Sequence, residues 1–142
     1  MKLIADELSA ARTVDLFAGT GALGLEAISR GARSCDFVEN NGAALHALKA
    51  NIAAFRLRER TRVFDRDAIP FVERLSARVY DVAFADPPYG SRKLDRIVAR
   101  WRDVPFSRVL VLEHSAAHQG LPQPPNRTMD DSAVTVLRAP VE

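Results

Sequence analysis

The sequence contains little of what marks an exported or metal-binding protein. A single cysteine, Cys35, occurs among its 142 residues and cannot form a disulfide within the chain. The three histidines are scattered and lack the spacing of metal ligands, so we expect no metal site. Asp6 and Glu7 interrupt the amino-terminal segment, where a signal peptide needs an unbroken apolar stretch. These features predict an intracellular, cytoplasmic protein.

Long hydrophobic runs are missing as well. No apolar stretch approaches the roughly 18 residues that a membrane span needs, so we expect no membrane segment. Hydrophobic residues make up 47% and charged residues 27% of the chain, a composition that favours a globular over a disordered protein. The length of 142 residues predicts a single domain. A formal net charge of only +2 permits a polyanionic partner without demonstrating one.

Short aliphatic runs alternate with longer helical patterns along the chain. This alternation predicts an α/β fold, with a mostly parallel sheet that is covered by helices on both faces. The last two runs predict a carboxyl-terminal hairpin. The predicted strands are residues 13–18, 35–39, 61–64, 80–85, 108–113, 127–130 and 133–137. The predicted helices are residues 22–30, 42–55, 68–75 and 92–102.

Two of the predicted helices have a clear apolar face. Apolar side chains recur at helical spacing in both, and we expect those side chains to be buried. In residues 42–55 they are Leu45, Leu48, Ile52 and Phe55, and in residues 92–102 they are Leu94, Ile97, Val98 and Trp101.

A glycine-rich turn follows the first predicted strand and opens the first long helix. Residues 19–24 have the form G-x-G-x-x-G, in which Gly19 and Gly21 allow a sharp turn and the close approach of a ligand. Glu39 ends the second predicted strand and can accept hydrogen bonds from both hydroxyls of a ribose. The pair predicts an adenosine-containing cofactor and fits a dinucleotide equally well. The alternative is a tight strand–helix turn beside a solvated acid.

Two further acids lie at the ends of predicted strands. Asp15 belongs to an otherwise apolar run, so its carboxylate either pairs with a cofactor ammonium or accepts hydrogen bonds from loop amides. Asp67 and Ala68 follow the third predicted strand. There the carboxylate of Asp67 can accept a hydrogen bond from an adenine amino group, or it can cap the next helix.

The most informative segment is Asp86-Pro87-Pro88-Tyr89, directly after the fourth predicted strand. The two prolines remove two backbone donors, so the turn presents two acceptors, the Asp86 carboxylate and the Pro87 carbonyl. Two converging acceptors suit an amino group, and Tyr89 offers a flat surface on which a flipped-out base can stack. A simple proline turn that ends a strand is the alternative. Together with the glycine turn, the segment favours methyl transfer over hydride transfer.

Residues 14–27, 37–39 and 86–89 together resemble the bacterial small-subunit ribosomal RNA guanine-N2 methyltransferases. The resemblance runs from about residue 13 to residue 138. It implies the class I methyltransferase (Rossmann-like) fold, with a seven-stranded, mostly parallel sheet and an antiparallel carboxyl-terminal hairpin. It also implies S-adenosylmethionine as the cofactor, and methyl transfer to the N2 amine of a guanine in rRNA or in the small ribosomal subunit.

The resemblance implies a role for each motif residue. Those that would bind the cofactor are Asp15, Phe17, Gly19, Gly21, Glu39, Asn40, Asp67 and Ala68, and those that would hold the target base are Asp86, Pro87, Pro88 and Tyr89. Three departures stand out. Arg66 stands where the family usually has glycine, and Asn40-Asn41 replaces a charged pair. Relatives carry a β-hairpin and an Arg-Pro-Thr segment before the first strand, and we expect residues 1–142 to be a single methyltransferase domain without that extension.

Lys93, Arg96 and Arg100 share one face of a predicted helix and either contact RNA phosphates or form a solvated face.

The Asp-Pro-Pro-Tyr turn also occurs in adenine-N6 methyltransferases, which makes adenine an alternative target. A nicotinamide-dependent oxidoreductase is a second alternative, although no catalytic histidine arrangement is present. A domain that binds cofactor or nucleic acid without catalysis is the third. Nothing in the sequence predicts an oligomeric state.

Overall fold

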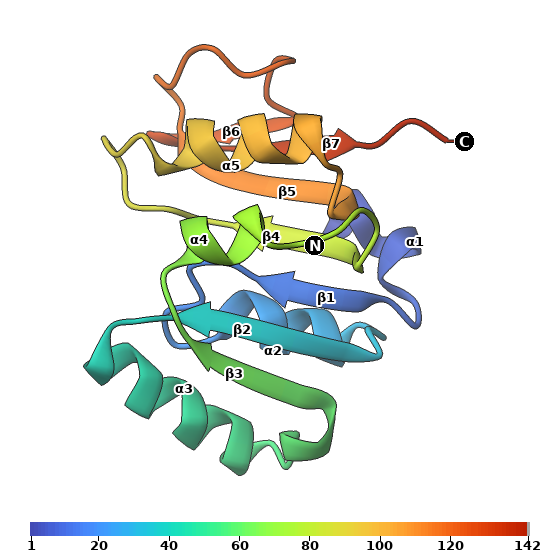
Figure 1. Ribbon diagram of the computed structural model, residues 1–142, viewed down its shortest axis with the longest axis vertical. Helices are drawn as coiled ribbons and strands as arrows, with labels where there is room; N and C mark the ends of the chain where they lie inside the picture. The colour runs from blue at the N-terminus through green and yellow to red at the C-terminus, as the bar shows by residue number, and fades with distance from the viewer. Residues whose placement is uncertain (142) are drawn as a thin grey trace.

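A seven-stranded sheet runs through the centre of the molecule (Figure 1). The computed structural model describes residues 1–141. Strands β1 to β5 pair in parallel, and β7 lies antiparallel to both β5 and β6. The predicted parallel sheet and terminal hairpin are therefore confirmed. The strands are β1 (Arg12–Asp15), β2 (Ser34–Glu39), β3 (Thr61–Asp65), β4 (Tyr80–Ala85), β5 (Ser107–Ser115), β6 (Arg127–Met129) and β7 (Ser132–Arg138).

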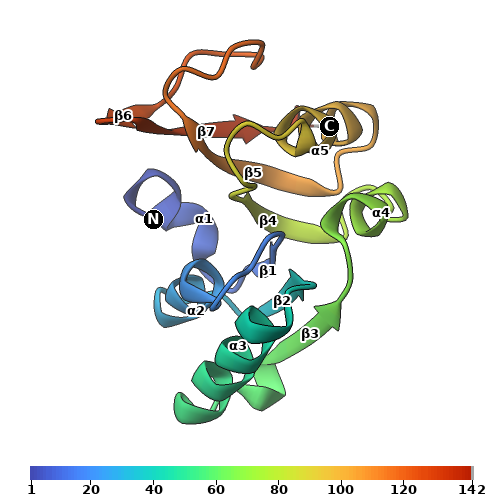
Figure 2. The same cartoon turned by 90° about the vertical axis from the view of Figure 1, so that its left-hand side faces the viewer.

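Helices cover both faces of this sheet. One face carries α1 (Ala5–Leu8), α2 (Ala22–Ser29) and α3 (Gly42–Ala54), and the other carries α4 (Ala68–Glu73) and α5 (Lys93–Asp103) (Figures 1 and 2). The sequence patterns did not predict α1 or the short 3-10 helices η1 (Lys2–Ile4) and η2 (Arg58–Arg60). Within residues 1–141, no helix has the length and apolar character needed to cross a bilayer.

The order of the strands reverses at β1. The sheet runs β3-β2-β1-β4-β5-β7-β6, so the chain moves outward from β1 to β3 and then returns to place β4 on the other side of β1. The register pairs Asp15 at the end of β1 with Phe84, one residue before the end of β4. The carboxyl ends of β1 and β4 therefore lie side by side. Ligands of open α/β sheets bind at such a reversal.

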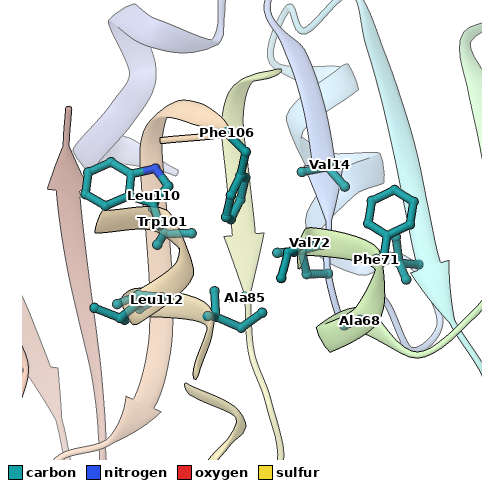
Figure 3. Packing of buried hydrophobic residues seen from close by; sticks show 14 of the residues in the cluster. Val14, Ala68, Phe71, Val72, Ala85, Trp101, Phe106, Leu110 and Leu112 are labelled. Carbon is teal, nitrogen blue, oxygen red and sulfur yellow. The ribbon is translucent and has the colours of Figure 1, made fainter. Parts of the chain in front are cut away.

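The core consists of two apolar layers, one on each face of the sheet. Figure 3 shows the layer beneath α4 and α5, to which Val72 of α4 and Trp101 of α5 both belong. The opposite layer includes Phe37 and Phe84 and lies beneath α1, α2 and α3. Because successive side chains of a strand point to opposite faces, the central strands supply apolar residues to both layers. This burial on both sides explains the continuous aliphatic runs of the sequence.

Most predicted element boundaries agree with the structure, and two expectations were wrong. The predicted strand 13–18 ends at Asp15, because Phe17 has a φ of +94° and leaves the extended conformation. Phe55 was expected in the core, but α3 ends at Ala54 and the side chain of Phe55 is 66% exposed. The other apolar-face residues of the two helices are buried as predicted, namely Leu45, Leu48, Ile52, Leu94, Ile97, Val98 and Trp101.

The close packing of α2 on β2 leads to a stability prediction. A Cβ added at Gly24 would lie 2.5 Å from Cε1 of Phe37 and 2.6 Å from Sγ of Cys35. Alanine favours a helix over glycine by about 1 kcal/mol, but overpacking a core costs about 1–3 kcal/mol. We therefore expect Gly24→Ala to lower the free energy of unfolding by about 1–2 kcal/mol in urea denaturation.

Gly42→Ala is the matched control. Gly42 lies in the first turn of α3, and a Cβ there would meet no atom within 4 Å. This variant should be neutral or more stable by up to about 1 kcal/mol. Equal gains in stability for the two variants would contradict the packing described for Gly24.

Candidate functional site

The turn after β1 is held between the two neighbouring strands. The backbone N–H of Leu16 donates to the carbonyl of Phe84 on the β4 side, at 2.8 Å. The backbone N–H groups of Phe17 and Ala18 donate to the carbonyl of Val38 on the β2 side, at 3.3 and 3.0 Å. Both neighbours of β1 thus fix the path of the turn. They hold Phe17 in a left-handed conformation that is costly for a residue other than glycine.

The two glycines at the start of the motif serve different purposes. Gly19 and Gly21 both have positive φ angles, +58° and +89°. A Cβ at Gly21 would clash with Cδ1 of Leu48 on α3, so this glycine allows α2 and α3 to approach. A Cβ at Gly19 would meet no atom within 4 Å. The backbone at Gly19 therefore borders open space, which a ligand can enter.

Glu39 fastens the glycine turn to the end of β2. Its carboxylate accepts hydrogen bonds from three backbone N–H groups, those of Gly19 at 2.7 Å, Asn40 at 3.1 Å and Asn41 at 2.9 Å. A carboxylate has about four acceptor positions, so these contacts leave roughly one free. Hydrogen bonds from both hydroxyls of a ribose, as predicted from the sequence, would require Glu39 to release at least one of these amides.

Asp15 is a buried acid directly beneath the turn. Asp15 is only 1% exposed, and its Oδ2 accepts a hydrogen bond from the backbone N–H of Gly24 at 3.1 Å. Burial raises the pKa of Asp15 to about 7, the hydrogen bond from Gly24 opposes this rise, and the charges of Asp86 and Glu39 add to it. Of the two sequence-based alternatives for Asp15, the structure shows the contact with a backbone amide.

The acids and amides after β2 and β3 act as helix caps. Asp67 accepts a hydrogen bond from the N–H of Ile69 at 3.2 Å and so caps α4, whose first residue, Ala68, is buried. Asn41 caps α3 in the same way, through the N–H of Ala44 at 2.9 Å. The capping alternative for Asp67 is therefore observed. Its carboxylate is exposed, and contact with an adenine stays a prediction.

The Asp-Pro-Pro-Tyr turn presents unpaired acceptors next to the glycine turn. Pro87 is buried, whereas Asp86, Pro88 and Tyr89 are exposed. Ser91 donates from both its N–H and its hydroxyl to the carbonyl of Pro88. Within residues 1–141, the Asp86 carboxylate and the Pro87 carbonyl accept no hydrogen bond. The two acceptors that the sequence predicted as a clamp for an amino group are thus available to a ligand.

Two factors make the Asp86 carboxylate less acidic than usual. Partial desolvation at the strand end, followed by the negative charge of Glu113, raises the pKa of Asp86 to about 6. Glu113 lies on β5, the strand next to β4. No motif of the sequence marks Glu113 as a functional residue. Its only signal was an acid at the end of an aliphatic run, and only the order of the strands places it near Asp86.

The three basic residues predicted to contact RNA differ in their surroundings. Nζ of Lys93 lies 5.9 Å from the centre of the Phe17 ring, a cation–π contact beside the glycine turn. Arg96 is exposed and lies 3.8 Å from Glu73. Arg100 donates hydrogen bonds to two backbone carbonyls at the end of α4. Arg100 therefore joins α5 to α4, and Lys93 and Arg96 are the two with side chains directed toward solvent or the site.

Hydrogen-bond acceptors dominate the chemistry of the site. Asp15, Glu39 and Asp86 lie at the carboxyl ends of adjacent strands, and their charges interact. Within residues 1–141, no group of three or more His, Cys, Asp or Glu side chains is placed to hold a metal ion. Such a site suits a ligand with several N–H or O–H donors, such as ribose hydroxyls and an exocyclic amine.

Most of the chain matches a known protein family. The family model described as Conserved hypothetical protein 95 matches residues 1–132. The chain is 31% identical over 117 residues to Ribosomal RNA small subunit methyltransferase D of Escherichia coli K12, a match that covers 81% of this chain and 58% of that protein. It is 36% identical over 89 residues to YlbH of Bacillus subtilis, named as a proposed rRNA methyltransferase. That match covers 61% of this chain and 48% of YlbH. The chain spans about half the length of these relatives.

Solved structures show the same architecture. The chain superposes on yhhF of Escherichia coli with a TM-score of 0.81 and 26% identity, covering 95% of this chain and 78% of the other. For the SAM-dependent methyltransferase of Agrobacterium tumefaciens the TM-score is 0.67 at 22% identity, and the match covers 84% of this chain and 44% of the other. At this identity the two proteins share the fold alone. The predicted class I methyltransferase fold is confirmed.

The buried carboxyl of Asp15 leads to a prediction for the pH dependence of stability. Its pKa of about 7 exceeds the value of about 3.9 in an unfolded chain, so the folded state favours the protonated acid. Its contribution to stability is complete below about pH 4 and is lost as the pH rises through 7. Asp15→Asn cannot ionise and should gain stability relative to the wild type between pH 4 and pH 8, by up to about 4 kcal/mol.

Urea denaturation of both proteins at several pH values measures this difference. Other titrating groups are common to the two proteins and cancel in the comparison. A difference that stays constant from pH 4 to pH 8 would show that Asp15 is ionised throughout.

Proposed function

The chain belongs to the family described as Conserved hypothetical protein 95, and from this premise we propose that it transfers a methyl group from S-adenosylmethionine to the exocyclic N2 amine of a guanine in small-subunit rRNA. Similarity to Ribosomal RNA small subunit methyltransferase D supports rRNA as the substrate. The unpaired acceptors of Asp86 and Pro87, beside the open turn after β1, carry the proposal of an amine as the target.

The residues around the glycine turn fit S-adenosylmethionine. The open space at Gly19 accommodates a ligand against the backbone, and the Glu39 carboxylate retains acceptor capacity for a ribose hydroxyl. When bound, the cofactor supplies an electrophilic methyl group on its sulfonium. The residues that would hold it are Asp15, Phe17, Gly19, Gly21, Glu39, Asn40, Asp67 and Ala68.

The Asp-Pro-Pro-Tyr turn would position the target amine. Asp86 and the Pro87 carbonyl each accept one N–H, which orients the nitrogen lone pair away from the plane of the base. Pro88 and the exposed ring of Tyr89 offer a surface on which the flipped base stacks. Transfer of the methyl group from the sulfonium sulfur to this nitrogen breaks the S–C bond as the N–C bond forms, and would place positive charge on the nitrogen. The Asp86 carboxylate stabilises this charge and accepts the departing proton, which it then passes to water.

RNA contacts would extend from this turn along α5. Lys93 lies beside the glycine turn, and Arg96 is exposed one helical turn further along the helix. Lys93 forms no salt bridge within residues 1–141, and Arg96 has only a contact of 3.8 Å with Glu73. Both cations suit sequence-independent contacts with phosphates. The substrate is then free rRNA or the small ribosomal subunit in the cytoplasm.

Replacement of Asp86 tests the proposed function directly. Asp86→Ala should lower kcat for methyl transfer to undermethylated small ribosomal subunits at least about 100-fold, because it removes one arm of the clamp and the proton acceptor. Its affinity for S-adenosylmethionine, measured by calorimetric titration, should stay within about threefold of the wild type. The control is Asp103→Ala at the far end of α5, where the side chain is 78% exposed, and it should leave both quantities unchanged. Unchanged transfer by Asp86→Ala would refute the role of Asp86.

The pKa of Asp86 predicts the pH dependence of the reaction. Only the ionised carboxylate accepts a hydrogen bond on both oxygens and takes up a proton, so kcat/KM, which reports the pKa values of the free enzyme, should rise as the pH passes about 6. Between pH 5 and pH 7.5 the ionised fraction of the free enzyme increases about tenfold, and kcat/KM should follow it. The residual activity of Asp86→Asn should lack this rise. A rise that persists in Asp86→Asn would assign the titration to another group.

A further inference from the structure

A small apolar cavity reaches Ala85, the residue before Asp86, on the face of the sheet that carries α1 and α2. Its volume is about 190 Å³. Figure 2 shows the amino-terminal segment and α1 on this side of β4 and β5. Its lining includes Ile4, Leu23, Phe84, Val111 and Val134, together with one charged side chain, that of Glu113. A cavity of this composition suits the flat apolar surfaces of a base, with a single polar group to orient it.

The register of the sheet places Glu113 level with Asp86. Ala85 is paired with Leu112 on the parallel strands β4 and β5, so Asp86 and Glu113 are the next residues on each strand. Adjacent strands are about 4.8 Å apart, and equivalent positions point to the same face. Glu113 therefore lies on the same face as Val111 and next to the Asp-Pro-Pro-Tyr turn.

Glu113 has no polar partner within residues 1–141. Its carboxylate forms no hydrogen bond and no salt bridge there, although the residue is half-buried among the apolar groups of the cavity. This carboxylate is therefore available to the hydrogen-bond donors of a ligand. Asp86, the neighbouring acid, also lacks a donor. Two adjacent carboxylates without donors suit a ligand that presents adjacent N–H groups.

Among the common bases, guanine has such an edge. Its N2 amine lies next to an N1–H donor, whereas the amines of adenine and cytosine lie next to a ring nitrogen with a lone pair. A second carboxylate would attract the first arrangement and repel the other two. Acceptors bound to neighbouring N–H groups lie a few ångströms apart, as side chains on adjacent strands do.

We propose that Glu113 is a specificity-determining residue, which accepts the N1–H of the target guanine while Asp86 holds its N2 amine. One face of the base would contact the apolar lining beside Glu113, which includes Val111, and the other face would stack on Tyr89. The pair of acids thus distinguishes guanine from adenine and cytosine by the donor next to the amine. This inference rests on the proposed function, because it assigns Glu113 a role in that same site.

An RNA with 2-aminopurine in place of the target guanine tests the role of Glu113. This base retains the 2-amino group but has a lone pair at N1 instead of an N1–H. The nucleotide methylated by the wild-type protein is first mapped in small-subunit RNA with a labelled methyl donor, and 2-aminopurine is then introduced at that position. The quantity compared is the ratio of kcat/KM for the two RNAs.

The wild-type protein should prefer guanine at least about 100-fold, since a site built to accept a hydrogen bond rejects a base without that donor. Glu113→Gln can donate to the N1 lone pair and should reduce the preference to less than about tenfold. Glu59→Gln is the matched control on an exposed surface and should keep the wild-type ratio. Because the ratio is measured on one protein sample, a partial loss of folding cancels.

Two negative results have different meanings. Methylation of guanine by the wild type with an unchanged ratio in Glu113→Gln would overturn the role of Glu113 and leave the proposed function standing. No transfer to guanine by the wild type would overturn the proposed function itself, and the role of Glu113 with it.

Discussion

The reversal of strand order at β1 is the constraint from which the site follows. Because β2 and β4 lie on either side of β1, the turn after β1 is hydrogen-bonded to both neighbours, through the carbonyls of Val38 and Phe84. These contacts hold Phe17 in an unfavourable conformation and open the backbone at Gly19. The same reversal brings Asp86 to the edge of that turn. Without it, the glycine turn and the Asp-Pro-Pro-Tyr turn would be unrelated loops.

Acidic residues gather at this edge in spite of their mutual repulsion. Asp15 is buried, Glu39 is bound to three backbone amides, and Asp86 and Glu113 are free of donors within residues 1–141. The first two acids accept hydrogen bonds from N–H groups at the start of a helix or loop, although the charge of the buried Asp15 lowers stability as the pH rises. The other two contribute nothing comparable to the fold. Both carboxylates are available to a ligand rich in hydrogen-bond donors.

The packing of α2 on the sheet stabilises the same turn. The first turn of α2 lies so close to β2 that Gly24 has no room for a side chain beside Phe37. This close approach lets the backbone N–H of Gly24 reach the carboxyl of Asp15. The third glycine of the motif thus serves packing, whereas Gly19 borders the ligand space. The glycine motif thus provides both a packing contact at Gly24 and a binding surface at Gly19. Both depend on the absence of a side chain at these positions.

The sequence by itself determined the alternation of strands and helices, the parallel sheet, the terminal hairpin and the two motif turns. These depend on local periodicity and on glycine and proline, which act within a few residues. The tertiary structure alone decided the end of β1 at Asp15, the exposure of Phe55, the use of Arg100 as a link between α4 and α5, and the position of Glu113 beside Asp86. Each of these depends on contacts between segments far apart in the chain, and local residue patterns carry no record of which strand will lie next to which.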